Sequence, residues 1–299
     1  MKIYLFEIQE GEAESFAPLE KEHQVICRKE KLTAENAGQF EDADYVSVFV
    51  HSDLDADAIE AMPGLKGIAT RSTGFDHIDM DACRKQEIPV AFVPTYGENT
   101  VASHAIGLLL NIAHRISDGI DRTRKGDFTN QGLQGFDIAG KTIGVIGASG
   151  SIGRHFTRMA RGLEMKVLAQ DVVEDEEFAR EWNFDYVDMD ELCRNADFIS
   201  VHVPLNEKTE GMIDASVFDK VKKGCIFINT SRGGVVNERD LLKALASGRV
   251  GAAGLDVVSA EPIIREEAEL VRMVMEEKEK WGQLLVNETL LNMRNVYAT

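Results

Sequence analysis

The segment GVIGASGSIG, residues 144–153, decides the fold of the second half of the chain. It follows an apolar, strand-like run and precedes a helix-like run, which is where a nucleotide-binding turn lies. Its glycines, Gly147, Gly150 and Gly153, are spaced G-x-x-G-x-x-G, one residue longer than the usual G-x-G-x-x-G. Such a turn presents backbone N–H groups and the positive end of a helix dipole to an anion. We predict that Gly147 makes the turn, Gly150 admits a pyrophosphate and Gly153 lets the helix pack on the sheet. The alternative is a purely structural glycine-rich turn.

An acidic residue ends the next strand-like run, KVLAQD. Asp171 lies eighteen positions after Gly153, where a carboxylate can accept both ribose hydroxyls of a dinucleotide. The same carboxylate repels a 2′-phosphate, so the pattern favours NAD over NADP. Alternatively, Asp171 only caps the segment that follows. The order strand, glycine turn, helix, strand and acid favours the cofactor site.

Short β-rich runs alternate with helical patterns along the whole chain, as is typical of βαβ units and parallel sheets. The chain is therefore predicted to be α/β, with two doubly wound parallel-sheet domains: a flavodoxin-like domain over residues 1–98 and a Rossmann domain over residues 99–295. Residues 296–299 are predicted to begin a return to the first domain. A single long helix is predicted over residues 99–126, with Asn99 or Thr100 as its N-cap, leading into the second domain. The strand candidates are KIYLFEI, QVICR, YVSVFV, LKGIATR and VAFVP in the first domain, and AGKTIGVIG, KVLAQD, DFISVHV, GCIFINTS, GAAGLDV and NVYAT after it.

Composition excludes several classes of partner. The net charge of −18 argues against a nucleic-acid or anionic-membrane partner, since both need basic patches. No secretory signal or apolar run long enough to cross a bilayer is visible. The four cysteines form no C-x-x-C pair, which indicates reduced thiols in a cytoplasmic protein, and no metal site is expected.

The stretch INTSRGGVVNERDLLKAL places Arg232 at the end of a predicted strand, before a Gly-Gly turn. Ligands of open α/β sheets lie at the carboxyl ends of strands, so Arg232 is expected at the cofactor crevice. A guanidinium can bind a carboxylate through two hydrogen bonds and polarise a neighbouring carbonyl. Taken alone, Arg232 is better explained as a surface arginine near a loop.

The chain as a whole resembles the D-2-hydroxyacid dehydrogenase family, most closely its D-lactate dehydrogenase branch. The resemblance rests on TRSTGFDHIDMDA, VPTYGENTVASHAIG, GKTIGVIG, VHVPLNEKTEGMI, INTSRGG and GLDV, which occur in the family's order and approximate spacing. It implies hydride exchange between NAD(H) and a small 2-oxo acid such as pyruvate. It also implies two domains that close over the substrate and a homodimer formed through the NAD-binding domain, with the helix near residues 100–120 contributing.

The resemblance further implies roles for individual residues. Arg232 would bind the substrate carboxylate, and Glu261 would pair with the catalytic histidine and raise its pKa. Substrate contacts are implied for the backbone of Thr73 and Gly74 and for Tyr96. Cofactor contacts are implied for Ser151, Ile152, Val203, Pro204, Thr209, Thr230, Ser231 and Asp256.

One departure from the family pattern bears on activity. The family's proton donor is a histidine in a Pro-His pair after the strand written here NVYAT, and residues 1–299 contain no counterpart. The family's returning C-terminal helix has no counterpart either. We therefore expect a truncated, NAD-binding chain with impaired turnover. His77 is the nearest alternative donor, but a structural hydrogen bond explains it better.

Rival functions remain open at this point. A relative acting on glyoxylate, hydroxypyruvate or phosphoglycerate would share the same motifs. A non-catalytic NAD(H)-binding scaffold or sensor would fit the missing histidine, although it would not need Arg232 and Glu261. A short-chain reductase is excluded, because its glycine turn lies near the N-terminus and its Tyr-x-x-x-Lys motif is absent.

Overall fold

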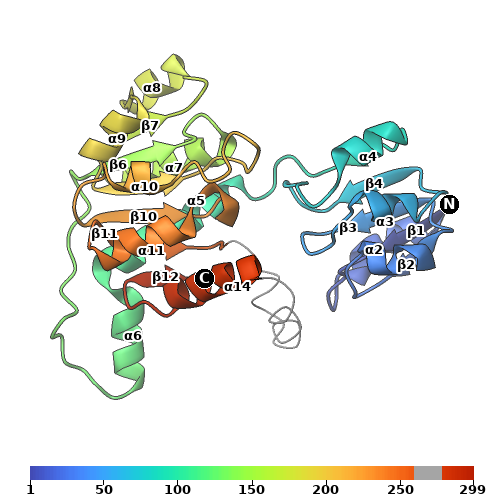
Figure 1. Cartoon of the computed structure of the whole chain (residues 1–299), viewed down its shortest axis with the longest axis horizontal. Helices are drawn as coiled ribbons and strands as arrows, with labels where there is room; N and C mark the ends of the chain where they lie inside the picture. The colour runs from blue at the N-terminus through green and yellow to red at the C-terminus, as the bar shows by residue number, and fades with distance from the viewer. Residues whose placement is uncertain (259–277) are drawn as a thin grey trace. The chain divides into compact units, whose positions relative to one another are not determined.

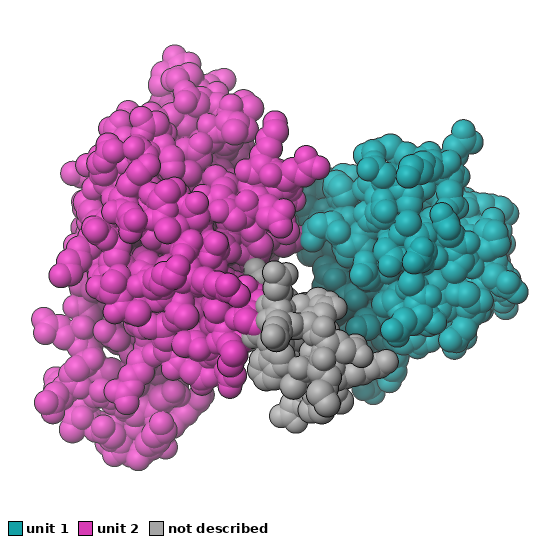
Figure 2. Space-filling model, viewed as in Figure 1, with its two compact units in different colours: residues 1–97 teal, residues 98–299 magenta. Residues whose placement is uncertain are grey.

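The computed structural model describes residues 1–258 and 278–299, which divide into two compact units, Met1–Gly97 and Glu98–Thr299 (Figure 2). Each unit is an α/β fold built on one parallel sheet, as the sequence predicts.

Unit 1 contains a five-stranded parallel sheet in the order β2-β1-β3-β4-β5. This is the flavodoxin-like order, in which the strand order reverses between β1 and β3. Its core gathers the rings of Tyr4, Phe6 and Phe40, with Phe6 and Phe40 packed edge to face at 4.8 Å. The elements in chain order are β1 (Lys2–Leu5), η1 (Ala13–Phe16), α1 (Ala17–Glu20), β2 (Gln24–Cys27), α2 (Ala34–Ala37), η2 (Gly38–Phe40), β3 (Tyr45–Val48), α3 (Ala56–Glu60), β4 (Gly67–Thr70), α4 (Met80–Lys85) and β5 (Val90–Ala91).

Unit 2 contains a seven-stranded parallel sheet in the order β12-β11-β10-β9-β6-β7-β8, which Figure 1 shows as a stack of strands. Counted from β6, this is the Rossmann order 3-2-1-4-5-6 with one added edge strand. The elements in chain order are α5 (Glu98–His114), α6 (Ile116–Arg124), β6 (Thr142–Ile146), α7 (Ser151–Gly162), β7 (Lys166–Gln170), α8 (Glu176–Trp182), β8 (Asp185–Tyr186), α9 (Met189–Asn195), β9 (Phe198–Val201), α10 (Ala215–Phe218), β10 (Cys225–Asn229), η3 (Gly233–Val235), α11 (Glu238–Ala246), β11 (Val250–Leu255), α14 (Lys278–Leu291) and β12 (Val296–Ala298).

Strand residues of unit 2 alternate between two apolar layers, one on each face of the sheet. Ile226 and Ile228 join the layer under α5 and α7, whereas Phe227 joins the layer that contains residues of α9, α10 and α11. This alternation follows from the period of two along a strand and explains why the strands are apolar on both sides.

The predicted long helix over 99–126 is wrong in one respect: it is two helices, α5 and α6, and the first begins at Glu98. The break is at Arg115, whose φ of 56° is left-handed. The Ala113 carbonyl accepts from the N–H of Phe136, and the N–H of Ser117 donates to the Asn111 side chain at 2.8 Å. Both groups are therefore taken from the helical ladder by residues that the helical periodicity does not reveal.

Residues 296–299 lie in unit 2, where β12 pairs in parallel with β11 and the N–H of Thr299 donates to the Leu255 carbonyl at 3.1 Å. That they begin a return to the first domain stays a prediction. The remaining predicted strands each overlap an observed strand, while the two-residue strand β8 was not predicted. All four cysteines are free thiols. Among the described residues, no helix has the length and apolar character needed to span a membrane, and no group of three metal-ligating side chains occurs.

Candidate cofactor and substrate site

The glycine turn lies between β6 and α7, where the strand order reverses. Gly147 has a φ of +87°, and a Cβ there would lie 2.6 Å from the carbonyl oxygen of His202 at the end of β9. A Cβ on Gly153 would overlap the Gly147 carbonyl oxygen. Both positions therefore require glycine. The longer turn keeps the close approach of helix, turn and neighbouring strand that the shorter one is built for.

The N-terminus of α7 is uncapped. Gly150, its N-cap residue, has extended backbone angles, and no side chain of the described residues bonds the first N–H groups of the helix. Ser151 is exposed and Ile152 is half-buried in the first turn. Uncapped N–H groups at the positive end of a twelve-residue helix form a favourable place for a phosphate.

Asp171 lies directly after β7, next to this turn. One carboxylate oxygen accepts from the N–H of Ser149 at 2.8 Å and the other from the N–H of Val172 at 2.7 Å. Val172 and Val173 follow it and are 95% and 68% exposed, although they are apolar. The sequence analysis did not single out these two valines. An exposed apolar pair beside a fixed carboxylate offers a surface against which a nucleotide base can pack.

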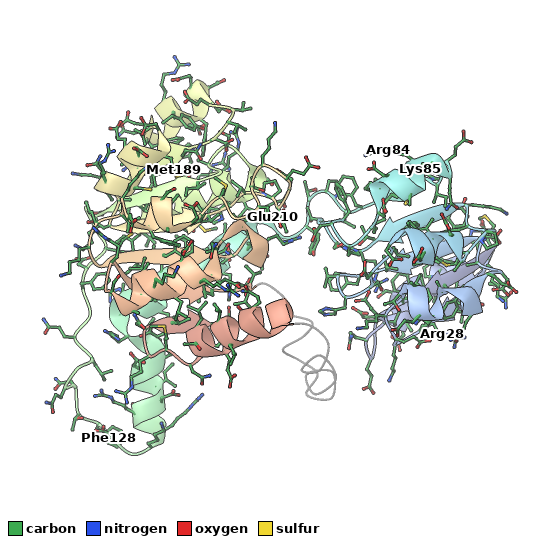
Figure 3. The ribbon with its side chains drawn as sticks, viewed as in Figure 1. Arg28, Arg84, Lys85, Phe128, Met189 and Glu210 are labelled. Atoms are coloured by element: carbon green, nitrogen blue, oxygen red, sulfur yellow. The ribbon has the colours of Figure 1, made fainter. Side chains whose placement is uncertain are left out.

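Three further predicted cofactor residues lie in the loop after β9. The Val203 side chain lies 3.0 Å from where a Gly147 Cβ would be, so it packs on the glycine turn. The Thr209 hydroxyl donates to the Pro204 carbonyl at 2.6 Å and accepts from the N–H of Asn206 at 2.9 Å. Thr209 thus closes the loop, and Glu210 beside it is exposed (Figure 3).

Thr230, Ser231 and Arg232 lie at the carboxyl end of β10. Asn229 organises this end, because its side chain accepts from the Ser231 hydroxyl at 2.7 Å and donates to the Arg232 carbonyl at 3.0 Å. The half-buried Arg232 donates to the Ser231 carbonyl at 2.9 Å. The Thr230 hydroxyl is buried, and among the described residues it has no hydrogen-bond partner. A buried polar atom without a partner is costly, which suits a position that a ligand completes.

Asp256 lies at the carboxyl end of β11, and its surroundings were not foreseen. One of its carboxylate oxygens accepts from the Thr299 hydroxyl at 2.9 Å and lies 3.3 Å from Nε2 of His104 on α5. Nothing in the helical sequence pattern around His104 points to this contact. Glu261, predicted as the partner of the catalytic histidine, lies outside the described residues.

Unit 1 carries the predicted substrate residues in loops that follow β4 and β5. The Thr73 hydroxyl donates to the Val93 carbonyl at 3.0 Å, and the Ser72 hydroxyl donates to the Gly74 carbonyl at 2.6 Å. Tyr96 is 59% exposed, so its ring is not part of the core. His77, the alternative donor, is 3.2 Å from the Thr70 hydroxyl through Nε2.

Burial settles the protonation state of one histidine near the turn. His202 is enclosed beside Phe156, and the loss of solvent lowers its pKa to about 3. Its Nε2 lies 2.9 Å from the Ser200 hydroxyl. His202 is therefore neutral near pH 7 and cannot serve as a proton donor there.

Known proteins share the sequence of unit 2. The family model described as "D-isomer specific 2-hydroxyacid dehydrogenase, NAD binding domain" matches residues 106–278, more than half of the chain. The chain belongs to the D-isomer-specific 2-hydroxyacid dehydrogenase family. Its sequence motifs indicate the same family of NAD-dependent dehydrogenases, and unit 2 is its NAD-binding Rossmann domain.

Curated relatives carry more than one substrate name. A 2-hydroxyacid dehydrogenase homolog of Zymomonas mobilis is 36% identical over 80% of this chain and 73% of its own. D-lactate dehydrogenase of Escherichia coli is 35% identical over 77% of this chain and 70% of its own. Hydroxypyruvate reductase of Thermotoga maritima is 37% identical over 82% of each chain. These relatives belong to one family, and their names give different substrates.

Solved structures give the same fold. D-lactate dehydrogenase of Aquifex aeolicus, solved with NAD and lactic acid, superimposes with a TM-score of 0.86 at 30% identity, covering 99% of this chain and 87% of that one. The glycine turn at Gly147–Gly153, the N-terminus of α7 and the buried Thr230 hydroxyl, which has no partner among the described residues, fit NAD in this member of the dehydrogenase family.

Proposed function

We propose that this dehydrogenase reduces a small 2-oxo acid to the D-2-hydroxy acid with NADH, with pyruvate as the first candidate substrate. The observation that carries the proposal is the uncapped N-terminus of α7 beside Asp171, at the point where the strand order reverses. Bound NADH would supply the hydride that adds to the C2 carbonyl carbon, while a proton adds to the carbonyl oxygen.

The chain's own residues are proposed to bind and orient. Arg232 binds the substrate carboxylate through its guanidinium, supported by its place at the carboxyl end of β10 and by the bonds that Asn229 makes around it. Ser151 and Ile152 lie along the pyrophosphate, Thr230 and Ser231 line the cofactor crevice, and Asp256 accepts from the carboxamide. In unit 1, the Thr73–Gly74 backbone and Tyr96 are proposed substrate contacts.

The experiment that tests the function is a substrate panel. NADH oxidation is followed with pyruvate, hydroxypyruvate, glyoxylate and a phosphoglycerate-type oxo acid. We expect the highest kcat/KM with pyruvate. Hydroxypyruvate is the second candidate, since a relative of that name covers a similar share of the chain. The absence of NADH binding would contradict the whole proposal.

Asp171→Asn is expected to weaken NADH binding about 10- to 100-fold, because a charged acceptor of the ribose hydroxyls becomes a neutral amide, a change of about 1.5–3 kcal/mol. NADPH binding should change less, since the repulsion of its 2′-phosphate also falls. Titration of nucleotide fluorescence measures both. Asp185→Asn, at an exposed acid on β8, is the matched control. Unchanged NADH affinity in Asp171→Asn would remove Asp171 from the site.

We propose that the polypeptide of residues 1–299 binds NADH but turns over slowly. The support is that the Pro-His donor of the family has no counterpart among these residues. A scaffold or sensor role would share the slow turnover, so restoring the donor separates the two. The four free cysteines support a reducing, cytoplasmic compartment.

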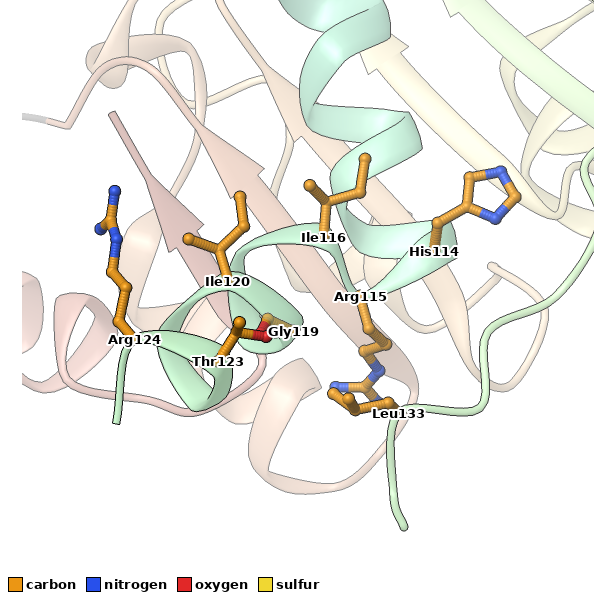
Figure 4. A pocket seen from close by; sticks show the side chains of 8 residues that line it. All are labelled: His114, Arg115, Ile116, Gly119, Ile120, Thr123, Arg124 and Leu133. Atoms are coloured by element: carbon orange, nitrogen blue, oxygen red, sulfur yellow. The ribbon is translucent and has the colours of Figure 1, made fainter. Parts of the chain in front are cut away.

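We also propose a homodimer formed through unit 2. Helix α6 and the loop after it expose Ile116, Ile120 and Phe128, which we call the α6 surface; Phe128 is 81% exposed (Figure 3). A cavity of about 500 Å³ opens among the side chains of α6 and Leu133 (Figure 4). A helix that exposes apolar side chains beside a cavity can pack on its own copy about a two-fold axis, so that the side chains of each copy fill the cavity of the other.

Ile120→Glu is expected to convert the dimer to a monomer at micromolar concentration, because it would bury a carboxylate in the apolar contact. Light scattering coupled to gel filtration measures the mass. Leu19→Glu on α1, where the leucine is 40% exposed, is the matched control and should leave the dimer intact. A monomeric parent chain would contradict the proposal.

A further inference from the structure

The residue that lengthens the glycine turn has bonds of its own. Two residues separate Gly147 from Gly150, where the usual fingerprint has one. Ala148 is fully buried in the core under α7, whereas Ser149 lies toward the loop between β7 and α8. Ser149 is thus the residue for which the shorter turn has no room.

Each polar group of Ser149 has a partner. Its N–H donates to the Asp171 carboxylate at 2.8 Å, and its carbonyl accepts from Nε of Arg154 at 2.9 Å. Its hydroxyl donates to the Val173 carbonyl at 2.5 Å and lies 2.7 Å from the Tyr186 hydroxyl. Because a serine hydroxyl has one hydrogen, which Val173 accepts, the Tyr186 hydroxyl must be the donor in the last contact.

These bonds fasten three segments to the turn: the end of β7, the loop after it, and β8. The loop is held a second time at its far end, where Arg154 pairs with Asp175 while its guanidinium lies 4.8 Å from the centre of the Phe178 ring. Asp171 therefore stands between two fixed supports, the N–H of Ser149 and that of Val172.

We propose that Ser149 is a positioning residue that sets the preference for NAD over NADP by fixing the Asp171 carboxylate for the ribose hydroxyls. This inference rests on the proposed cofactor role of Asp171. A 2′-phosphate could bind here only if the Asp171 side chain rotated away or if a cationic side chain moved in to pair with the phosphate. Ser149 holds Asp171 in place through its N–H and through its hydroxyl bond to the Val173 carbonyl. Its carbonyl, together with Asp175, holds the Arg154 guanidinium and so keeps this cation from moving to the phosphate.

A preorganised acceptor also binds more tightly, since its ordering cost is met during folding. The extra residue of the longer turn therefore contributes to cofactor recognition. It makes recognition of the adenosine ribose depend on a residue of the phosphate turn as well as on the acid.

The test compares dissociation constants for NADH and NADPH, measured by nucleotide fluorescence with the full 299-residue chain. Ser149→Ala removes the hydroxyl bonds; we expect the ratio of the NADPH to the NADH dissociation constant to fall about 10-fold. Ser149→Thr keeps a hydroxyl and should restore most of the ratio. Deleting Ser149 also removes the N–H contact and should lower the ratio further. Ser247→Ala, whose hydroxyl donates to Ala244 at the end of α11, should leave the ratio unchanged.

Hydrogen exchange of the nucleotide-free chain gives a second readout. Ser149→Ala should speed exchange of the amides at Val172 and Val173, and Ser247→Ala should not. If the variant that lacks Ser149 fails to fold, the Ser149→Ala variant tests the proposal by itself. A ratio unchanged within about twofold, in a chain that binds NADH, would overturn the role of Ser149 alone. A parent chain that binds neither nucleotide would overturn the proposed function, and this inference with it.

Discussion

Gly150→Ala is expected to fold normally and to bind NADH at least about 30-fold more weakly than the parent chain. The backbone of Gly150, with φ of −66° and ψ of 160°, suits any residue. A Cβ there would lie 3.4 Å from the Gly147 carbonyl oxygen and 4.0 Å from that of His202, which are ordinary contacts. The added methyl group therefore disturbs little in the free protein, but it lies at the N-terminus of α7 where a diphosphate must approach. Calorimetric titration with NADH measures the loss.

Gly153→Ala, three residues on, should behave differently. Its Cβ would overlap the Gly147 carbonyl oxygen and lie 2.8 Å from Cα of Ala148, so backbone must move. We expect a loss of about 3 kcal/mol of unfolding free energy, measured by urea denaturation. Gly162→Ala has open space around it and serves as the control. Full NADH affinity in Gly150→Ala would show that the pyrophosphate does not lie at α7.

The parallel sheet of unit 2 was predictable because its central strands β6, β9, β10 and β11 consist almost entirely of buried residues. These strands are apolar on both faces because helices cover both sides of the sheet, and a run of apolar residues is visible in the local sequence. The break at Arg115 was not predictable. It depends on Phe136, twenty-one positions later, whose N–H takes the Ala113 carbonyl from the helix. Helical periodicity carries no information about such a distant competitor.

Some residues of the candidate site could be predicted from the sequence, and others could not. Gly147 and Gly153 could be predicted because the local chain geometry requires glycine there, and Asp171 could be predicted from its place directly after the next strand. The role of Ser149 could not, because it depends on Tyr186 and Val173 meeting the turn in space. The contact of His104 with Asp256 joins residues 152 positions apart, on α5 and at the end of β11. Only the assembled sheet brings them together.

A chain extended by Pro-His after Thr299 is expected to reduce pyruvate about 100- to 10,000-fold faster than residues 1–299, the usual contribution of a general acid. Strand β12 runs parallel to β11, and Thr299 bonds Leu255 and Asp256 at its end. Residues that follow Thr299 therefore emerge at the carboxyl edge of the sheet, the edge that holds Thr230, Ser231 and Arg232. A histidine placed there can donate the proton that the new hydroxyl requires.

The matched control is a Pro-Gln extension, which has a similar size but no titratable group, and it should leave turnover low. NADH should still bind all three chains within a few-fold of one another, because the glycine turn and Asp171 lie on the other side of β9, along β6 and β7. In the Pro-His chain, kcat for reduction should fall as the pH rises, since only protonated histidine can donate. Fast turnover by residues 1–299 would show that another group supplies the proton. An inert Pro-His chain that still binds NADH would favour the non-catalytic reading, because the hydride donor and the acid would then both be present without producing a reaction.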